Sequence, residues 1–441
     1  METVSILGGG PAGLSAAYFL KINNMPFHLY ESSNTVGGNC KTLSFDKCKY
    51  DTGAHRFHSK NSIATKVIKE LIKNDLAIVN APSKIFFNSK MINFPLEPKS
   101  FLIDFNFYET IKIIIENTCN IFKKSNNTLS FKNSAYSKYG KTISDKFLIN
   151  YTEKLWGANS DLLHREVTGD RFNNLTPISI LKNIINSKGS SAKHLEGDFL
   201  YPKKGYGQIF YEMGKLVQDK TSINSKVERI YVSNNAIQQI RLSNGDILKT
   251  ANVISTLPLN ILVKIFQPNL PNKVIEMGNK LKFRDLRLAI FTLKCDFFSK
   301  NASLYFPEKT IPFTRIYEPK NRSIEMAPEG KTCIVVETPY SPGDDVGSMN
   351  DKEFLEKVQD HLVKNNIVDN KLFLKSSSMT MPNAYPVITK ESKILIEKIN
   401  QYLRQFKNLK IIGRNAQFKY LHTHHLIKDA YYAIEELQRA Y

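Results

Sequence analysis

The sequence predicts an α/β protein in which a discontinuous domain carries an inserted α+β domain. Three observations favour this fold class. A glycine-rich turn joins a strand pattern to a helix pattern near the N-terminus, strand patterns return in the middle of the chain, and the C-terminus again reads as a strand followed by a helix. With 441 residues, the chain is also longer than one ordinary domain.

The first turn reads Gly8-x-Gly10-x-x-Gly13, between the apolar strand pattern "VSIL" and a helical pattern. Gly8 permits a tight turn, Gly10 lets the backbone approach a pyrophosphate, and Gly13 lets the helix pack closely on the strand. The helix starts near Pro11 and Ala12, so its N-terminus directs partial positive charge at the phosphates. This pattern is typical of a Rossmann-like dinucleotide-binding turn.

The next strand pattern, "PFHLYE", ends at Glu31, where an acidic side chain can hold ribose hydroxyls. A second glycine pair, Gly37-Gly38, and the basic Lys41 follow. NAD does not require this pair, which resembles the flavoprotein signature in which the loop closes over FAD. We therefore expect FAD, with NAD as the alternative. The expected cofactor-binding residues in this region are Gly8, Gly10, Ala12, Gly13, Glu31, Gly37, Gly38 and Lys41.

The stretch "DTGAHRFHSK" (51–60) contains two histidines, His55 and His58. It resembles the G-x-H-x-F loops that lie against the flavin ring in amine-oxidase-like flavoenzymes, and most of all the His-x-Phe-His form of UDP-galactopyranose mutases. Gly53 permits close backbone approach. The resemblance implies catalytic roles for His55 and His58, and contact of Gly53 and His55 with the cofactor. A zinc site needs more ligands than the sequence shows nearby, so we expect no metal.

The resemblance extends from residue 4 to about 438. "NYTEKLWGANSDLL" is similar to the Y-T-x-K-x-W-G motif of the mutases and their protoporphyrinogen-oxidase-like relatives. "GDRFN" and "PFTRIYEPKN" resemble the segments whose arginines, here Arg171 and Arg315, meet a substrate diphosphate. The chain is identified as a member of the FAD-dependent amine-oxidase/protoporphyrinogen-oxidase-like superfamily, closest to UDP-galactopyranose mutase-like proteins.

The C-terminal stretch "IIGRNAQFKYLHTHHL" resembles the G-R-x-x-x-x-x-Y segment that closes over the flavin. The resemblance implies cofactor contacts for Gly413, Arg414 and Tyr420. The expected substrate-binding residues are Tyr151, Trp156, Tyr317 and Tyr420. Where mutases carry acidic residues after this tyrosine, the present chain has Leu421-His422-Thr423-His424-His425, so its substrate could differ.

Residue chemistry supports these assignments but leaves alternatives open. The planar fork of arginine binds two phosphate oxygens at once, and its charge does not vary with pH. Tyr151 and Trp156 offer flat faces for stacking. Alternatively, each arginine could form a surface ion pair, and Trp156 could be a core residue. For the three histidines after Leu421, a cofactor contact or simple loop filling is favoured over a metal cluster.

The resemblance implies an FAD-dependent isomerase that interconverts pyranose and furanose forms of a nucleotide sugar, a cell-surface glycan precursor, with catalytic Arg171 and Arg315. A second interpretation is an FAD oxidoreductase of the amine-oxidase/protoporphyrinogen-oxidase type, in which the arginines bind substrate carboxylates. A third is a flavin-binding partner without catalytic activity. Fold resemblance alone does not decide among them.

Composition restricts the partners. The formal net charge is 61 − 41 = +20, which suits a small anionic substrate such as a nucleotide sugar. We find no nucleic-acid motif, no secretory signal and no apolar run long enough to span a membrane.

"FNFYETIKIIIENTCNIFKK" is interrupted by Glu109, Lys112 and Glu116, and we expect a packed helix there rather than a membrane-surface helix. Five scattered cysteines favour a cytoplasmic protein, and a homodimer is a further expectation.

The domain boundaries follow from these patterns. We assign 1–90, 196–275 and 396–441 to the FAD-binding domain, and 91–195 and 276–395 to the substrate-binding domain. Within the first domain, Asn244-Gly245 is a hairpin turn signal, "NVISTLP" a strand that returns to the nucleotide sheet, and "LKIIG" its last strand.

Overall fold

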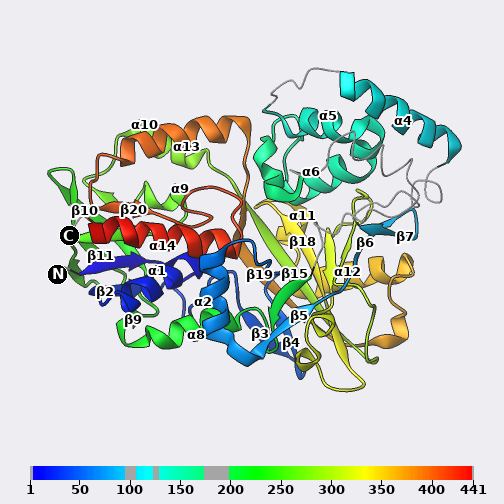
Figure 1. The fold of residues 1–441 in the computed structure, drawn as a ribbon, viewed down its shortest axis with the longest axis horizontal. Coiled ribbons are helices and arrows are strands. Elements are labelled where there is room, and N and C mark those ends of the chain that lie inside the picture. The colour runs from blue at the N-terminus through cyan, green and yellow to red at the C-terminus, as the bar shows by residue number, and fades with distance from the viewer. Residues whose placement is uncertain (1–2, 95–105, 123–128, 173–197, 440–441) are drawn as a thin grey trace.

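The computed structural model of this chain describes residues 3–94, 106–122, 129–172 and 198–439, with only the backbone for 169–172. Figure 1 shows both described chain ends at one end of an elongated molecule, in the half that carries the glycine-rich turn. A large sheet occupies the centre, and a group of helices lies at the opposite end.

The half with the chain ends is built on a five-stranded parallel sheet of order β20-β13-β1-β2-β9. Its strands are β1 (Val4–Leu7), β2 (Phe27–Tyr30), β9 (Thr221–Ser222), β13 (Asn252–Ser255) and β20 (Leu409–Ile411). Every residue of β1 is buried, as expected for a strand covered on both faces. The predicted return of "NVISTLP" and "LKIIG" to the nucleotide sheet is confirmed.

Helix α1 (Pro11–Ile22) lies against this sheet. Helices α8 (Gln208–Leu216) and α14 (Thr423–Arg439) pack on α1, and α2 (Ser62–Ile72) packs on both of them. Figure 1 shows the C-terminal helix α14 beside α1, the first helix of the chain. In α1, all residues from Ala12 to Leu20 are buried, because the helix is enclosed by the sheet and by other helices. The glycine-rich turn at its N-terminus is therefore held by packing along the whole helix.

A four-stranded sheet of order β12-β11-β10-β14 extends the same half of the molecule. It contains β10 (Val227–Ser233), β11 (Ala236–Leu242), β12 (Ile247–Lys249) and β14 (Phe266–Gln267). The predicted Asn244-Gly245 turn is confirmed: it joins β11 to β12, and Gly245 has φ +94°. Three helices lie close by: α9 (Leu259–Leu262), α10 (Asn272–Asn279) and α13 (Lys390–Leu403).

The central sheet has seven strands in the order β19-β15-β18-β17-β16-β6-β7. They are β6 (Ser83–Phe87), β7 (Lys90–Phe94), β15 (Phe283–Leu293), β16 (Ser303–Tyr305), β17 (Arg315–Tyr317), β18 (Thr332–Tyr340) and β19 (Phe373–Pro386). Helices α11 (Asp345–Ser348) and α12 (Asp351–Lys364) follow β18. The sheet contains strands from both sides of residue 90, and the proposed division into two domains stays a prediction.

Helices at the far end come from the first predicted insert. They are α4 (Phe107–Phe122), α5 (Phe131–Ile143), the π-helix η2 (Ser144–Ile149), α6 (Asn150–Trp156) and the 3-10 helix η3 (Arg165–Phe172). Two short antiparallel strand pairs complete the fold: β3 (Thr42–Phe45) with β4 (Cys48–Asp51), and β5 (Leu76–Val79) with β8 (Phe199–Pro202).

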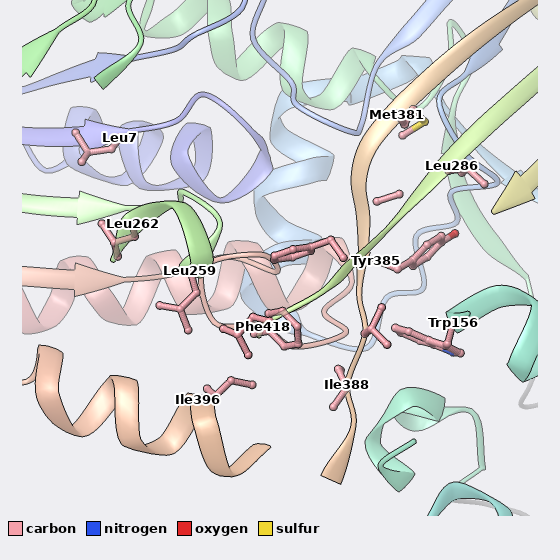
Figure 2. Close-up of a cluster of buried hydrophobic side chains, with 14 of the residues drawn as sticks. Leu7, Trp156, Leu259, Leu262, Leu286, Met381, Tyr385, Ile388, Ile396 and Phe418 are labelled. Carbon is pink, nitrogen blue, oxygen red and sulfur yellow. The ribbon is translucent and has the colours of Figure 1, made fainter. Parts of the chain in front are cut away.

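One buried cluster links the parts of the molecule. Figure 2 shows apolar side chains that run from Leu7 and Leu259 in the nucleotide half, past Tyr385 on β19, to Trp156 at the end of α6. Because this cluster is continuous, packing alone sets the distance between the glycine-rich turn and the helical end.

Candidate functional site

The glycine-rich turn leaves no space for side chains. Gly8 has φ +103°, and a Cβ atom there would lie 2.4 Å from Thr256 Oγ1. A Cβ atom at Gly13 would lie 1.9 Å from the Gly8 carbonyl oxygen. At Gly10, by contrast, a Cβ atom would meet protein only at 3.8 Å, at the Gly38 Cα atom. Gly10 is therefore not required by protein packing, and its missing side chain leaves room for a ligand against the turn.

Glu31 lies at the end of β2 and faces this turn. Its Oε2 accepts a hydrogen bond from the Gly9 backbone N–H at 2.6 Å, and its Oε1 accepts one from the Ser33 N–H at 2.8 Å. The Gly37 N–H in turn donates to the Gly9 carbonyl at 2.8 Å. The glycine-rich turn, the end of β2 and the 37–38 glycine pair thus meet at one point. The sequence predicted cofactor contacts in all three of these segments.

The other predicted contacts extend this cradle. Lys41 Nζ donates to Thr35 Oγ1 at 2.8 Å, within the same loop. Gly413 has φ +102°, and a Cβ atom there would lie 3.1 Å from the Ala12 Cβ. The C-terminal segment therefore lies against the first turn of α1, and its contact with the cofactor stays a prediction.

Arg414 shapes the loop that follows. Its Nε and Nη2 donate to the Leu421 carbonyl at 3.0 and 2.7 Å, and its guanidinium lies 5.0 Å from the centre of the Tyr420 ring. Because Arg414 makes these contacts within its own loop, it holds Tyr420 in place and adds positive charge beside it.

His55 lies at the inner side of the 51–60 stretch. Its ring stacks on Tyr206 with 5.0 Å between ring centres, and its Nε2 is 3.2 Å from the Asn39 carbonyl oxygen. A carbonyl only accepts, so Nε2 carries the proton and Nδ1 is left as an acceptor. Burial, followed by the charges of Arg414, Arg322 and Arg315, lowers the pKa of His55 to about 3. The imidazole is therefore neutral near pH 7.

A buried carboxylate holds this stretch in place. Asp51 is fully buried and accepts hydrogen bonds from Thr42 Oγ1 at 2.6 Å, the Tyr206 N–H at 2.9 Å and the Tyr201 hydroxyl. The Tyr317 hydroxyl donates to the Asp51 backbone carbonyl. Burial raises the pKa of Asp51. The sequence analysis did not identify Asp51, because its partners lie far away along the chain.

His58 and Phe57 point elsewhere. The His58 ring lies 6.0 Å from the Phe199 ring, whereas Phe57 is 1% exposed and pairs through its backbone with Leu200. The structure therefore brings His55, but not His58, next to Tyr206. A catalytic role for His58 stays a prediction that this geometry does not support.

Arg315 on β17 is paired with a glutamate that the sequence analysis missed. Its Nε and Nη2 each donate to the Glu337 carboxylate at 2.8 Å, and the Ala54 N–H donates to the same carboxylate at 3.0 Å. Burial alone would lower the pKa of Arg315, but the Glu337 carboxylate raises it well above its usual value. Glu337 is 1% exposed, and it connects the arginine with the loop that carries His55.

Tyrosines surround Arg315. Tyr385, Tyr151 and Tyr305 all lie close enough to contribute to its electrostatic environment. The rings of Tyr151 and Tyr305 are 5.9 Å apart. Tyr305 and Tyr385 were not predicted, and their local sequence carries no signal beyond an aromatic residue on a strand.

Trp156 is a core residue. It is 2% exposed, and its ring lies 5.7 Å from Tyr385 and 5.2 Å from Tyr420 in edge contacts, as Figure 2 shows for Tyr385. Of the two interpretations in the sequence analysis, the core residue therefore describes the surroundings of Trp156. Its ring packs against Tyr385 and Tyr420 and supports them. Tyr317 is likewise 1% exposed, beneath Arg322, whose guanidinium lies 4.8 Å from its ring centre.

The predicted site residue Arg171 lies in η3, but its side chain is outside the described part of the structure.

The three histidines after Leu421 lie close to one another. The ring of His422 lies 5.2 Å from the Tyr420 ring, and the rings of His424 and His425 lie 4.0 Å apart. Within the described ranges, no group of three or more His, Cys, Asp or Glu side chains could hold a metal ion.

The site as a whole fits a flavin dinucleotide. The narrow cradle at Gly10, the carboxylate of Glu31 at the end of β2, and the closing loops at Gly38 and Gly413 match the phosphates and ribose of such a molecule.

Comparisons with known proteins agree with this geometry. The family described as "flavin containing amine oxidoreductase" matches residues 11–377. A coproporphyrinogen III oxidase of Staphylococcus aureus is 23% identical over 224 residues, 47% of each chain. The chain thus matches about half the length of that curated relative.

Solved structures show the same fold. A reduced UDP-galactopyranose mutase superposes with a TM-score of 0.88 at 20% identity, covering 100% of this chain and 94% of the other. A protoporphyrinogen-oxidase-type protein from Exiguobacterium sp. 255-15 has a TM-score of 0.77 at 14% identity, with 100% and 99% covered. At such low identities, these likenesses concern the fold. From the family match and the cradle together, this chain belongs to the flavin-containing amine oxidoreductase family, and its cofactor is FAD.

Proposed function

We propose that this enzyme acts on a nucleotide-sugar-like anionic substrate and interconverts its pyranose and furanose forms, as a UDP-galactopyranose mutase does. The observation that carries the proposal is the guanidinium of Arg315, held rigidly by Glu337 among Tyr151, Tyr305 and Tyr385. No described residue accepts a hydrogen bond from its Nη1, which is therefore available to a ligand oxygen.

This arrangement suits a phosphate-bearing ligand. Arg315 and Arg414 carry charges that do not change with pH, and both face aromatic rings suited to a sugar or base. The buried carboxylate near Arg315 belongs to Glu337, and its oxygens already accept hydrogen bonds from Arg315 and from the Ala54 N–H. The net charge offered to a substrate is positive.

Bound FAD supplies the covalent or redox chemistry in such an enzyme. The chain's own residues bind and orient the substrate. We propose that Arg315, together with Arg171 and Tyr420, stabilises negative charge on a departing diphosphate, while Arg414 contacts the cofactor. Neutral His55 offers Nδ1 as an acceptor near the cofactor without adding charge.

The second candidate is an FAD oxidoreductase that acts on amines or porphyrinogens. The family description and the coproporphyrinogen III oxidase relative support it. So does the 421–425 stretch, which holds three histidines and no carboxylate. In this case, the arginines would bind substrate carboxylates.

One set of assays separates the two. Purified protein, with its flavin spectrum recorded, is reduced with dithionite and incubated with UDP-galactopyranose, UDP-galactofuranose and related nucleotide sugars, and the products are separated by chromatography. Ring-size interconversion that requires reduced flavin supports the mutase proposal. Absence of any conversion, with oxygen consumption and peroxide formation on a porphyrinogen or amine, would establish the oxidoreductase instead.

Assembly and location are further proposals. We propose a homodimer in the cytoplasm, to be checked by molar mass in solution and by fractionation of cells. No helix in the described ranges has the length and hydropathy needed to cross a bilayer.

A further inference from the structure

Helix α4 exposes its apolar side and turns its acidic side inward. Its large exposed side chains are Phe107, Tyr108, Ile111, Ile114, Ile115, Ile121 and Phe122. At 100° per residue, these positions together with Thr118 and Cys119 form one continuous arc of about 160°. No charged residue of α4 lies on this arc. An ordinary surface helix has the opposite arrangement, with polar residues outside.

The charges of α4 show that its orientation is specific. Glu109 forms an ion pair with Lys146 on η2. Glu116 accepts hydrogen bonds from the Thr142 N–H at 2.8 Å and its hydroxyl at 2.9 Å. Buried Asn117 donates to the Tyr139 carbonyl at 3.2 Å. These contacts fasten the acidic side of α4 to the helices beneath it, so the helix cannot rotate its apolar arc inward without breaking them.

The exposed fractions show that no described part of the chain covers the arc. Phe107 is 83% exposed, Phe122 84% and Ile115 57%. Figure 1 shows α4 at the outer edge of the helical end, far from the nucleotide half of the molecule. Such a contiguous apolar surface marks an interaction site.

Area and charge select the kind of partner. A helix of 16 residues is about 24 Å long and about 10 Å wide, a footprint of roughly 240 Å². A stable protein interface needs roughly 800 Å² from each partner, so the arc alone is too small for a second copy of this chain. The formal charge of +20 favours a partner with an anionic surface.

A lipid surface has no such size requirement and can supply the anionic charge. The sequence predicts a packed helix here, and α4 does pack through its acidic side, but its apolar side is exposed. We propose that α4 lies in the interface of a membrane that contains anionic lipids, with its apolar arc among the acyl chains. Exposed Lys112 lies at the edge of the arc. A lysine in this position can extend its ammonium group to lipid phosphates while the apolar side chains enter the bilayer. The proposal does not depend on which reaction the enzyme performs.

The test is co-sedimentation and flotation of the FAD-loaded protein with vesicles of phosphatidylcholine alone or with 30% phosphatidylglycerol. Binding to the anionic vesicles is expected, weakened by salt. The double variant I111S/I115S should lower the partition coefficient by about tenfold or more for each isoleucine. The matched control is I261S/I394S, whose side chains are equally exposed on other helices: 41% and 56%, against 40% and 57%.

A native probe supplies a second readout. Cys119 is exposed on the arc, whereas the other four cysteines are buried or half-buried. An environment-sensitive fluorophore on Cys119 should brighten and shift to shorter wavelength when anionic vesicles are added. Circular dichroism and the flavin spectrum verify that each variant folds.

Three outcomes would overturn the proposal. The first is absence of binding to anionic vesicles. The second is binding that I111S/I115S and I261S/I394S weaken equally, which would show a general charge effect. The third is a dimer in solution that only I111S/I115S dissociates, without vesicle binding, which would make the arc an interface between two copies.

Discussion

Glu337 connects Arg315 to the loop that carries His55: its carboxylate accepts two hydrogen bonds from the guanidinium at 2.8 Å and one from the Ala54 N–H at 3.0 Å. The two halves of the candidate site, cofactor side and substrate side, thus share one buried acidic group. If that group is altered, both halves should respond together.

Replacing Glu337 by glutamine leaves a buried guanidinium without its counter-charge. We expect unfolding free energy to fall by about 3–5 kcal/mol, as for other broken buried ion pairs. The KM of the substrate should rise, because Arg315 loses its orientation. Urea unfolding and steady-state kinetics measure the two effects. Glu318→Gln is the control, since Glu318 is also 1% exposed but accepts from the Phe298 and Ser299 N–H groups instead. It should lower stability without changing KM, and an unchanged KM in Glu337→Gln would contradict the role assigned to Arg315.

The two glycines Gly10 and Gly13 should fail in different ways when replaced by alanine. A Cβ atom at Gly13 would lie 1.9 Å from the Gly8 oxygen, so the turn itself must deform. At Gly10 the nearest protein atom is 3.8 Å away, so Gly10→Ala should fold normally yet bind FAD at least about tenfold more weakly, because the methyl group displaces the phosphates. Thermal unfolding of the apoprotein and flavin titration distinguish the two. Normal FAD affinity in Gly10→Ala would show that the pyrophosphate does not bind against Gly10.

His55 should make the protein acid-sensitive. Its pKa is about 3 in the fold and near 6.5 in an unfolded chain, so the unfolded state binds more protons between these values. Stability should therefore fall as the pH drops from about 6.5 towards 3, by up to about 1.4 kcal/mol per pH unit from this group. His55→Gln should flatten that part of the stability curve, measured by denaturant unfolding at a series of pH values. An identical acid limb in both proteins would show that the imidazole is charged, or exposed to solvent, in the fold.

Lys154 should be a structural residue despite its place in a family-like motif. Its ammonium group donates to the carbonyl oxygens of Phe306, Glu308 and Phe313 at 2.7, 2.9 and 2.9 Å. Lys154→Met leaves three acceptors without their donor, and we expect a loss of at least about 3 kcal/mol in unfolding free energy. Lys309→Met is the control, because Lys309 is a mainly exposed lysine paired with Glu153 at 3.4 Å, and surface pairs contribute little. Equal stability of the two variants would show that the three carbonyls are hydrated when the lysine is removed.

The cofactor half of the site could be predicted because its constraints are local. Gly8 and Gly13 are required by the close packing of one turn, Gly10 leaves room for a ligand there, and Glu31 follows from the length of one strand–helix–strand unit. The apolar patterns of "NVISTLP" and "LKIIG" also indicated two later strands of the same sheet, because a strand buried on both faces is apolar along its length.

The substrate half could not be predicted in the same way. Glu337 meets Ala54 across 283 positions of sequence, and Asp51 meets Tyr206 across 155. Trp156 looks like a stacking residue in its motif, yet tertiary packing buries it behind Tyr385 and Tyr420.

The same contrast appears in α4. Its sequence predicts an amphipathic helix, but which side faces solvent depends on where Lys146 and Thr142 lie to receive Glu109 and Glu116. The sequence alone therefore determined the glycine-rich turn and two later strands of its sheet, because backbone conformation and apolar patterns act within a few residues. Only the tertiary structure decided the partners of Arg315, the burial of Trp156 and the direction of the apolar arc, because each depends on side chains that folding brings together from distant segments.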